Sequence, residues 1–257
     1  MPKPEQPVTQ PRQPVTQPKQ PVTQLKRLAR TAGAAYVLMG IFGVFAHLIV
    51  RSSVHVPGDA AATAANIAEK PSLFRLALVA DIAMATTFVA VGVLLFLALR
   101  HFQRHVAMLM VVFVAIGAGM TLINLLFHQA ALWVATDATY AAFSSDELVL
   151  FLVDLHHHGY TLAGIFFGLW LIPLGYLTYR AGLFPQALSV LLMVAGGSWI
   201  LDTLAAFAFP DVPTLRTILE VPRFAEFWLI LYLIIKGVRE PEARRPEQQG
   251  ERLQPDG

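Results

Sequence analysis

The residues best suited to chemistry in this sequence are acids and histidines that interrupt long apolar segments. Asp154, His156, His157 and His158 form the densest group, and further polar residues lie singly in other apolar segments: Asp81, Asn124, His128, Asp202 and Glu226. Ionisable groups are costly inside a membrane, so they commonly face the interior of a helix bundle and mark functional sites. We therefore take these residues as candidates for a ligand pocket.

Three kinds of chemistry fit the densest group. On a helix, Asp154, His157 and His158 share one face, whereas His156 points nearly opposite Asp154. A carboxylate with imidazoles three and four residues away could bind a divalent metal such as zinc or iron. The same residues could form a proton relay, or a hydrogen-bonded pair that ties helices together. The metal candidates are Asp154, His157 and His158, and the three alternatives stay open.

Several other chemistries find no support in the sequence. The chain has no cysteine, which excludes disulfides, thiolate catalysis and Cys-ligated zinc. It also carries no HExxH motif, serine-centred elbow, glycine-rich phosphate loop or nucleic-acid signature. Neither a familiar catalytic motif nor a nucleic-acid partner is therefore expected.

The segments that carry these residues are long enough to cross a lipid bilayer. Of 257 residues, 56% are hydrophobic and 14% are charged, against roughly a quarter charged in ordinary soluble domains. A bilayer needs about 20 apolar residues per helix. We predict an all-α, polytopic transmembrane helix bundle with six spans, within residues 31–50, 73–99, 106–134, 148–179, 184–209 and 218–235.

The six runs differ in their polar content but none is clearly interrupted. The last run contains Glu220, Arg223 and Glu226, which could satisfy one another along a helix surface. The halves of the chain show no convincing repeat. Together these features favour a binding or enzyme pocket over a pathway through the membrane.

Lys and Arg residues predict the orientation of the spans. With six spans, 14 of the 19 basic residues fall in the two tails and the loops between spans two and three and between spans four and five. Cytoplasmic segments of membrane proteins are enriched in Lys and Arg. We expect a multi-pass protein of the plasma membrane with both termini cytoplasmic.

The polar residues then lie toward the outer end of their runs. Counted inward from the outer ends, Asp81, Asp154 and Asp202 each lie at about 10 Å depth at 1.5 Å per residue. We therefore expect these aspartates and at least one of the histidines at 156, 157 and 158 to meet in one cavity that opens outward. Its occupant would be a small ligand or an ion.

Local motifs divide the remaining chain. The pentapeptide Gln-Pro-Val-Thr-Gln occurs at 6–10, 13–17 and 20–24, and its prolines predict a disordered tail over residues 1–27. The membrane domain should span residues 28–238, followed by a disordered tail over 239–257. In the first outer loop, Asp59 is a ready N-cap for a short Ala-rich helix that ends near Pro71.

One small-residue motif concerns helix packing. Gly164 and Gly168 form a GxxxG motif, which lets helix backbones approach closely. We interpret it mainly as an internal packing site, with a dimer face as the alternative. The oligomeric state is not predicted.

Several segments resemble the DUF4386 family of bacterial integral membrane proteins. They are the outer-loop segment 56–67 (VPGDAAATAANI), then residues 72–75 (SLFR) with Asp81, residues 154–156 (DLH), and residues 175–185 (GYLTYRAGLFP). The resemblance covers about residues 28–238 and implies a multi-helix membrane fold, with no activity, cofactor or functional residue attached. It also favours His156 over its two neighbours as the histidine typical of the family.

Three classes of function remain open. The first, which the polar cluster favours most, is binding or transport of a small ligand or ion in an outward-facing Asp/His pocket. The second is a metal-dependent intramembrane hydrolase that acts at the outer leaflet. The third is a bundle whose polar residues are purely structural.

Overall fold

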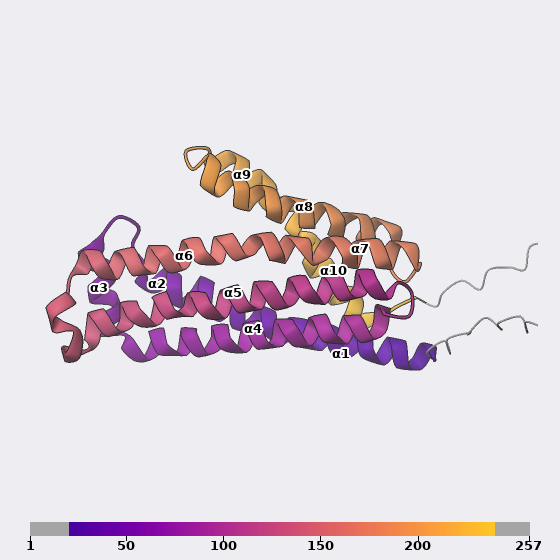
Figure 1. Cartoon of the computed structure of the whole chain (residues 1–257), viewed down its shortest axis with the longest axis horizontal. Coiled ribbons are helices and arrows are strands. Elements are labelled where there is room, and N and C mark those ends of the chain that lie inside the picture. Colours follow the sequence, from indigo (N-terminus) through magenta and orange to yellow (C-terminus); the bar gives the residue numbers. More distant parts are fainter. Residues whose placement is uncertain (1–20, 240–257) are drawn as a thin grey trace, which may run out of the picture.

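The computed structural model describes residues 21–239, and this part of the chain is all-α. Its long helices lie side by side in one elongated bundle (Figure 1). The helices are α1 (Val22–Gly43), α2 (Ser52–Val54), α3 (Ala60–Glu69), α4 (Pro71–Leu99), α5 (Arg104–Thr136), α6 (Asp146–Leu169), α7 (Leu171–Arg180), α8 (Gln186–Ala208), α9 (Pro213–Glu220) and α10 (Ala225–Ile235). Shorter helical segments are η1 (Val44–Arg51), η2 (Ala138–Phe143) and η3 (Val221–Phe224).

The first helix begins earlier than the sequence predicts. α1 begins at Val22, directly after Pro21, inside the segment 1–27 that we expected to be disordered. The last copy of the repeat leads into good helix formers, and Leu25 is buried against the bundle. The remainder of the predicted N-terminal tail and nearly all of the predicted C-terminal tail, residues 1–20 and 240–257, lie outside the described residues.

Within the described residues, five helical segments are long and apolar enough to cross a membrane. They are Val22–Val54, Pro71–Leu99, Arg104–Thr136, Asp146–Arg180 and Gln186–Ala208. Many large apolar side chains on them point away from the bundle, including Leu48, Ile123 and Leu126, each more than half exposed. Such an apolar outer surface suits lipid, so the chain is a polytopic helical membrane protein. Six spans and their orientation stay predictions.

Two of the predicted spans are interrupted, contrary to our expectation. The last run is divided into α9, η3 and α10. Pro222 explains the division, because it has no N–H to donate to Ile218 and its ring crowds that carbonyl. Pro173 acts in the same way between α6 and α7, where the helix is interrupted at Trp170.

The two ends of the described chain lie at the same end of the bundle. The start of α1 and the end of α10 are adjacent there (Figure 1), and the Arg30 guanidinium donates to the Ile235 carbonyl at 3.3 Å. An even number of crossings would produce this arrangement. The divided last run is therefore the place where a sixth crossing would occur.

The first outer loop has the structure that the sequence predicts. The Asp59 carboxylate accepts a hydrogen bond from the Ala62 N–H at 2.9 Å and caps α3, which ends at Glu69. The Val56 N–H donates to the Thr63 hydroxyl at 3.0 Å and closes the loop onto the helix. Ile67 is fully buried, so α3 covers the outer end of α5 and α6.

The GxxxG motif is an internal packing site, as predicted. A methyl group added at Gly168 would collide with the Gly196 carbonyl, and one at Gly164 would lie 2.7 Å from the Thr203 hydroxyl. Both contacts join α6 to α8. The motif is therefore occupied by α8 of the same chain.

Substitution of Gly168 by Ala should lower the stability of the bundle. The added methyl meets backbone rather than a movable side chain, and overpacking of this kind costs about 1–3 kcal/mol. Thermal unfolding in detergent measures the effect. Gly119→Ala on α5 is the control, because nothing lies within 4 Å of the added methyl; an equal loss in both variants would show that α6 and α8 are not in close contact at Gly168.

Candidate functional site

A guanidinium lies at the centre of a polar cluster near the end of the bundle that the sequence predicts to be external. We call this group, His47, Arg51, Asp81, Asn124, His128 and His156, the outer polar cluster. Arg51 on η1 forms an ion pair with Asp81 on α4. Its Nη1 atom lies 3.2 Å from His47 Nδ1, and its Nη2 atom lies 3.4 Å from His128 Nδ1 on α5. Asp81 and His128 are almost fully buried. The Arg51 cation therefore neutralises Asp81 and stands between two imidazoles.

The wide turn of η1 helps to form this cluster. η1 is a π-helix, a rare form that is frequent at functional sites. It places His47 and Arg51 on the same side, facing α4. His47 Nε2 also lies 3.3 Å from Asp81 Oδ1.

Of the three consecutive histidines, His156 is the one that enters the bundle. It is 3% exposed, whereas His157 and His158 are exposed. Asn124 on α5 donates to the His156 carbonyl at 2.7 Å, and His156 Nδ1 lies 3.1 Å from the Asn124 carbonyl. His156 Nε2 is buried without a hydrogen-bond partner in the described part of the chain. This orientation agrees with the family resemblance and answers the question that helix geometry alone left open.

Asp154, His157 and His158 lie at the rim of the bundle. Asp154 pairs with His55 at 2.9 Å, and its side chain is 42% exposed. His158 Nδ1 lies 2.7 Å from the Asp154 carbonyl rather than its carboxylate. Among the described residues, no three His, Asp or Glu side chains are grouped as metal ligands. The metal role of Asp154, His157 and His158 stays a prediction without a supporting contact.

Asp202 on α8 belongs to a third group of charged residues, where α8 contacts α9 and η3 of the divided last run. Its carboxylate lies 3.0 Å from Arg216 on α9 and 2.6 Å from Arg223 on η3. The Arg223 guanidinium also lies 4.1 Å above the ring of Trp199. These contacts attach α9 and η3 to α8. Arg223 therefore pairs with Asp202, not with Glu220 or Glu226 as the sequence had suggested.

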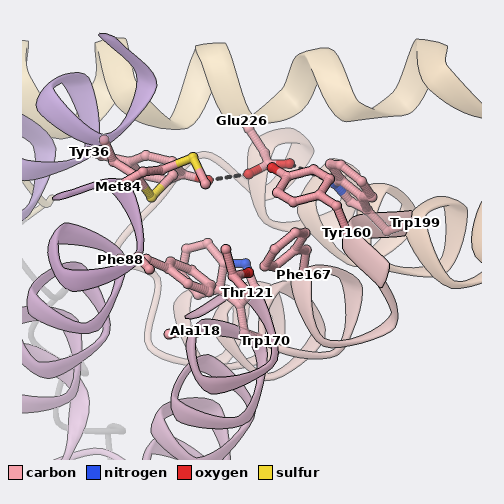
Figure 2. A pocket seen from close by; sticks show the side chains of 12 residues that line it. Tyr36, Met84, Phe88, Ala118, Thr121, Tyr160, Phe167, Trp170, Trp199 and Glu226 are labelled. Atoms are coloured by element: carbon pink, nitrogen blue, oxygen red, sulfur yellow. Dashed lines mark hydrogen bonds between the residues drawn. The ribbon is translucent and has the colours of Figure 1, made fainter. Parts of the chain in front are cut away.

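Glu226 is the deepest acid of the bundle. About 14 Å of helix separates it from the end of α10, roughly half of a 30 Å hydrocarbon core. One carboxylate oxygen accepts a hydrogen bond from the Tyr36 hydroxyl on α1, and the other accepts one from the Trp199 indole N–H at 2.8 Å (Figure 2). Both oxygens are thus held by neutral donors.

A cavity of about 100 Å³ lies against Glu226. Six aromatic side chains line it, and the close-up shows them gathered around the same space (Figure 2). They are Tyr36, Phe88, Tyr160, Phe167, Trp170 and Trp199. The interruption at Trp170, which follows from Pro173, lies beside this cavity.

The outer polar cluster lies directly beyond the cavity along the helices that they share. On α4, Asp81 precedes the lining residue Phe88 by two helical turns, and on α5 His128 follows Thr121 by two turns. On α6, His156 lies one turn outward of Tyr160. The Tyr160 ring is 4.2 Å from the ring of His47, so it joins the two sites.

The predicted pocket residues are thus divided among separate groups. Asp81, His128, Asn124 and His156 are neighbours, whereas Asp154, Asp202 and Glu226 each have other partners. Measured from the inner helix ends, Asp202 lies at about 24 Å, Asp81 at about 27 Å and Asp154 at about 39 Å. The acids occupy different heights because the outer ends of the helices are not level.

Sequence reasoning missed Arg51, His55 and the aromatic lining. Arg51 lies just after the first apolar run, and its spacing of four from His47 was a usable signal. The aromatic residues carry no signal of their own, because Phe, Tyr and Trp are common throughout apolar helices. Only the fold brings them together.

We predict that the Arg51–Asp81 pair is energetically coupled. Arg51→Leu leaves a buried carboxylate without its cation and should destabilise the protein by about 3–5 kcal/mol. The double variant Arg51→Leu/Asp81→Leu should be more stable than Arg51→Leu, because it removes the stranded charge. Thermal unfolding in detergent tests both, with exposed Glu69→Gln as control; a double variant as unstable as the sum of the single variants would contradict the coupling.

The comparisons with known proteins identify a family without an assigned activity. Residues 31–237 match the family described as "Domain of unknown function (DUF4386)". A protein of Archaeoglobus fulgidus described as "Uncharacterized protein" is 32% identical over 152 residues, which is 58% of this chain and 76% of the relative. No solved structure matches the chain. With its five helices able to span a membrane and its match over most of its length, the chain belongs to the DUF4386 family.

Proposed function

We propose that this protein binds a small ligand within the membrane, in the cavity beside Glu226. The observation that carries the proposal is the state of Glu226 itself. Within the described residues, it has no ion-pair partner, and neutral groups hold both of its oxygens against an open space. An acid at this depth is costly unless a proton or a bound ligand compensates its charge.

The cavity supports a binding role over a purely structural one. Unfilled space costs about 24 cal/mol per Å³, so a cavity of about 100 Å³ forgoes about 2 kcal/mol of packing. Two larger side chains at Ala85 and Ala118, which line the cavity, would fill much of that space. A bundle selected only for stability has no use for a hollow beside an enclosed acid.

The polar cluster beyond the cavity favours the predicted outer side as the side from which a ligand would enter. Tyr160 lies between the cavity and His47, and Arg51, Asp81, His128 and His156 continue outward from there. This succession supports entry of a polar ligand from the outer face. Transport across the membrane would need a second opening toward the inner end, where the described core is apolar.

The hydrolase alternative has weaker support. A metal-dependent hydrolase needs three protein ligands around an open coordination position. The described residues contain no such group, and at Asp81 the Arg51 guanidinium already takes the place between the carboxylate and two histidines.

The proposed orientation has both termini in the cytoplasm of a plasma-membrane protein. It rests on the 14 basic residues assigned to one side and on the adjacent ends of α1 and α10. A topology reporter fused at residue 140 and one fused after residue 240 should report opposite sides. The same side for both would contradict the six-span topology, which places an odd number of spans between the two reporters.

A cysteine scan tests access to the cavity, and the cysteine-free chain makes it direct. Thr121→Cys places a thiol in the cavity wall, and Leu122→Cys places one on the neighbouring, exposed apolar side of α5. A small water-soluble methanethiosulfonate should modify Thr121→Cys in intact membranes, and Leu122→Cys much more slowly because lipid covers it.

Modification after unfolding in detergent serves as the positive control for both thiols. A Thr121→Cys thiol that reacts only after unfolding would contradict a ligand site open to the outside. Equal rates for the two native variants would show that the reagent does not distinguish the cavity from the apolar surface.

A further inference from the structure

The aromatic side chains of the cavity form a connected wall. The rings of Phe88 and Trp170 lie 5.4 Å apart at 80°, and Phe88 meets Phe167 at 5.7 Å and 80°. Tyr160 and Trp199 extend this chain from Phe167 at 5.5 and 5.8 Å. Edge-to-face contacts of this kind fix the rings in place. The faces of aromatic rings carry partial negative charge, which attracts cations.

Glu226, which is partly exposed, differs from the buried acids Asp81 and Asp202 in its ionic partners. Asp81 has the Arg51 guanidinium and Asp202 has two guanidinium partners. Arg223 lies three residues from Glu226 and acts on it electrostatically from a distance, but the ion pair of its guanidinium is with Asp202 and its stacking contact is with Trp199. In the described part of the chain, the Glu226 carboxylate therefore faces the cavity without an ion-pair partner.

The contact between Arg223, which does not line the cavity, and Trp199 shows that one ring of the wall attracts a cation. The guanidinium lies 4.1 Å from the ring centroid of Trp199. This is within the distance of about 6 Å at which a cation is attracted to an aromatic face. Trp199 also lines the cavity and donates to Glu226.

The composition of the wall argues against a small inorganic cation. Hard cations such as magnesium and calcium need six or more oxygen ligands. The oxygens here are those of Glu226, Tyr36, Tyr160 and Thr121, and the Thr121 hydroxyl already donates to the Gly117 carbonyl at 3.0 Å. A weakly hydrated cation that prefers aromatic faces suits this wall better.

The cavity size limits the ligand further. An apolar cavity of about 150 Å³ holds benzene, so a cavity of about 100 Å³ suits a somewhat smaller molecule. An alkylated ammonium ion of about five heavy atoms has this size and carries one positive charge.

We propose that the cavity binds a small alkylated ammonium ion, with Glu226 opposite its charge and the aromatic rings around its alkyl groups. This inference rests on the proposed binding function and names the ligand class of the same site. The bound ion would supply the ion-pair partner that Glu226 lacks among the described residues.

Fluorescence of the cavity tryptophans tests the proposal. The chain has four tryptophans, of which Trp170 and Trp199 line the cavity, while Trp133 and Trp228 are exposed. In a Trp133→Phe/Trp228→Phe background, the signal comes from the cavity alone. Tetramethylammonium is the probe, titrated at constant ionic strength against sodium, and tert-butanol is the neutral molecule of matched shape.

We expect saturable quenching or shift by tetramethylammonium and an effect at least about tenfold weaker for tert-butanol, which carries no charge, and for sodium, which is strongly hydrated and gains little from aromatic faces. Glu226→Gln should weaken tetramethylammonium binding by about tenfold or more. Exposed Glu220→Gln, in the same segment, is the matched control and should bind as the native chain does.

The experiment does not depend on the folding of one variant. The comparison of tetramethylammonium with tert-butanol uses the native cavity, and Phe88→Leu removes one ring without touching Glu226, so it should weaken binding several-fold. Equal binding of the two probes, or no change in Glu226→Gln, would overturn the ammonium assignment.

The two proposals can fail separately. If Thr121→Cys is accessible but tetramethylammonium does not bind, the site exists and its ligand class is wrong. If Thr121→Cys is inaccessible and no probe binds, the binding function itself is wrong.

Discussion

The arrangement of the inner half of the bundle depends on one constraint, the satisfaction of Glu226 away from water. Its carboxylate must have donors, and it finds them on two different helices, Tyr36 on α1 and Trp199 on α8. These contacts hold α10 between α1 and α8, although α10 alone is too short to cross a bilayer. Arg223 and Arg216 then hold the preceding turns against Asp202. Contacts of an acid thus hold both parts of the divided last run: Asp202 holds α9 and η3, and Glu226 holds α10.

The cavity follows from the side chains that surround this acid. Helices that approach through glycine, such as α6 and α8 at Gly168, lie close together and leave little space. Next to that contact, the broad rings of Phe88, Phe167 and Trp170 hold one another edge to face, and small Ala85 and Ala118 do not fill the interval between them. Rigid rings beside small side chains leave a space that flexible side chains would have closed.

Much of this fold is predictable from the sequence, and the part that is not has identifiable causes. Apolar runs and the N-cap at Asp59 report on local structure, so five of the six expected long helices and the short helix after Asp59 were confirmed within the described residues. Glu226 and Asp81 were recognisable because a charge in an apolar run needs a partner. The partners of these acids were not predictable. A depth counted along the sequence requires that all helices end at the same level, whereas α5 is about 50 Å long and exceeds the membrane thickness. His156 shows the same limit: periodicity places it opposite Asp154, but only the fold shows which face turns inward.

The contrast among the acids argues that the deepest one has a different purpose. If the chain needed only to neutralise its enclosed carboxylates, Arg223 stands close enough in sequence to serve Glu226 as Arg51 serves Asp81. It is directed instead to Asp202, which already has Arg216. Among the described residues, Asp202 has two ion pairs and Glu226 has none, an uneven arrangement that general stability does not require. The unevenness is concentrated where the bundle is hollow, so the charge of Glu226 is available to the occupant of that cavity.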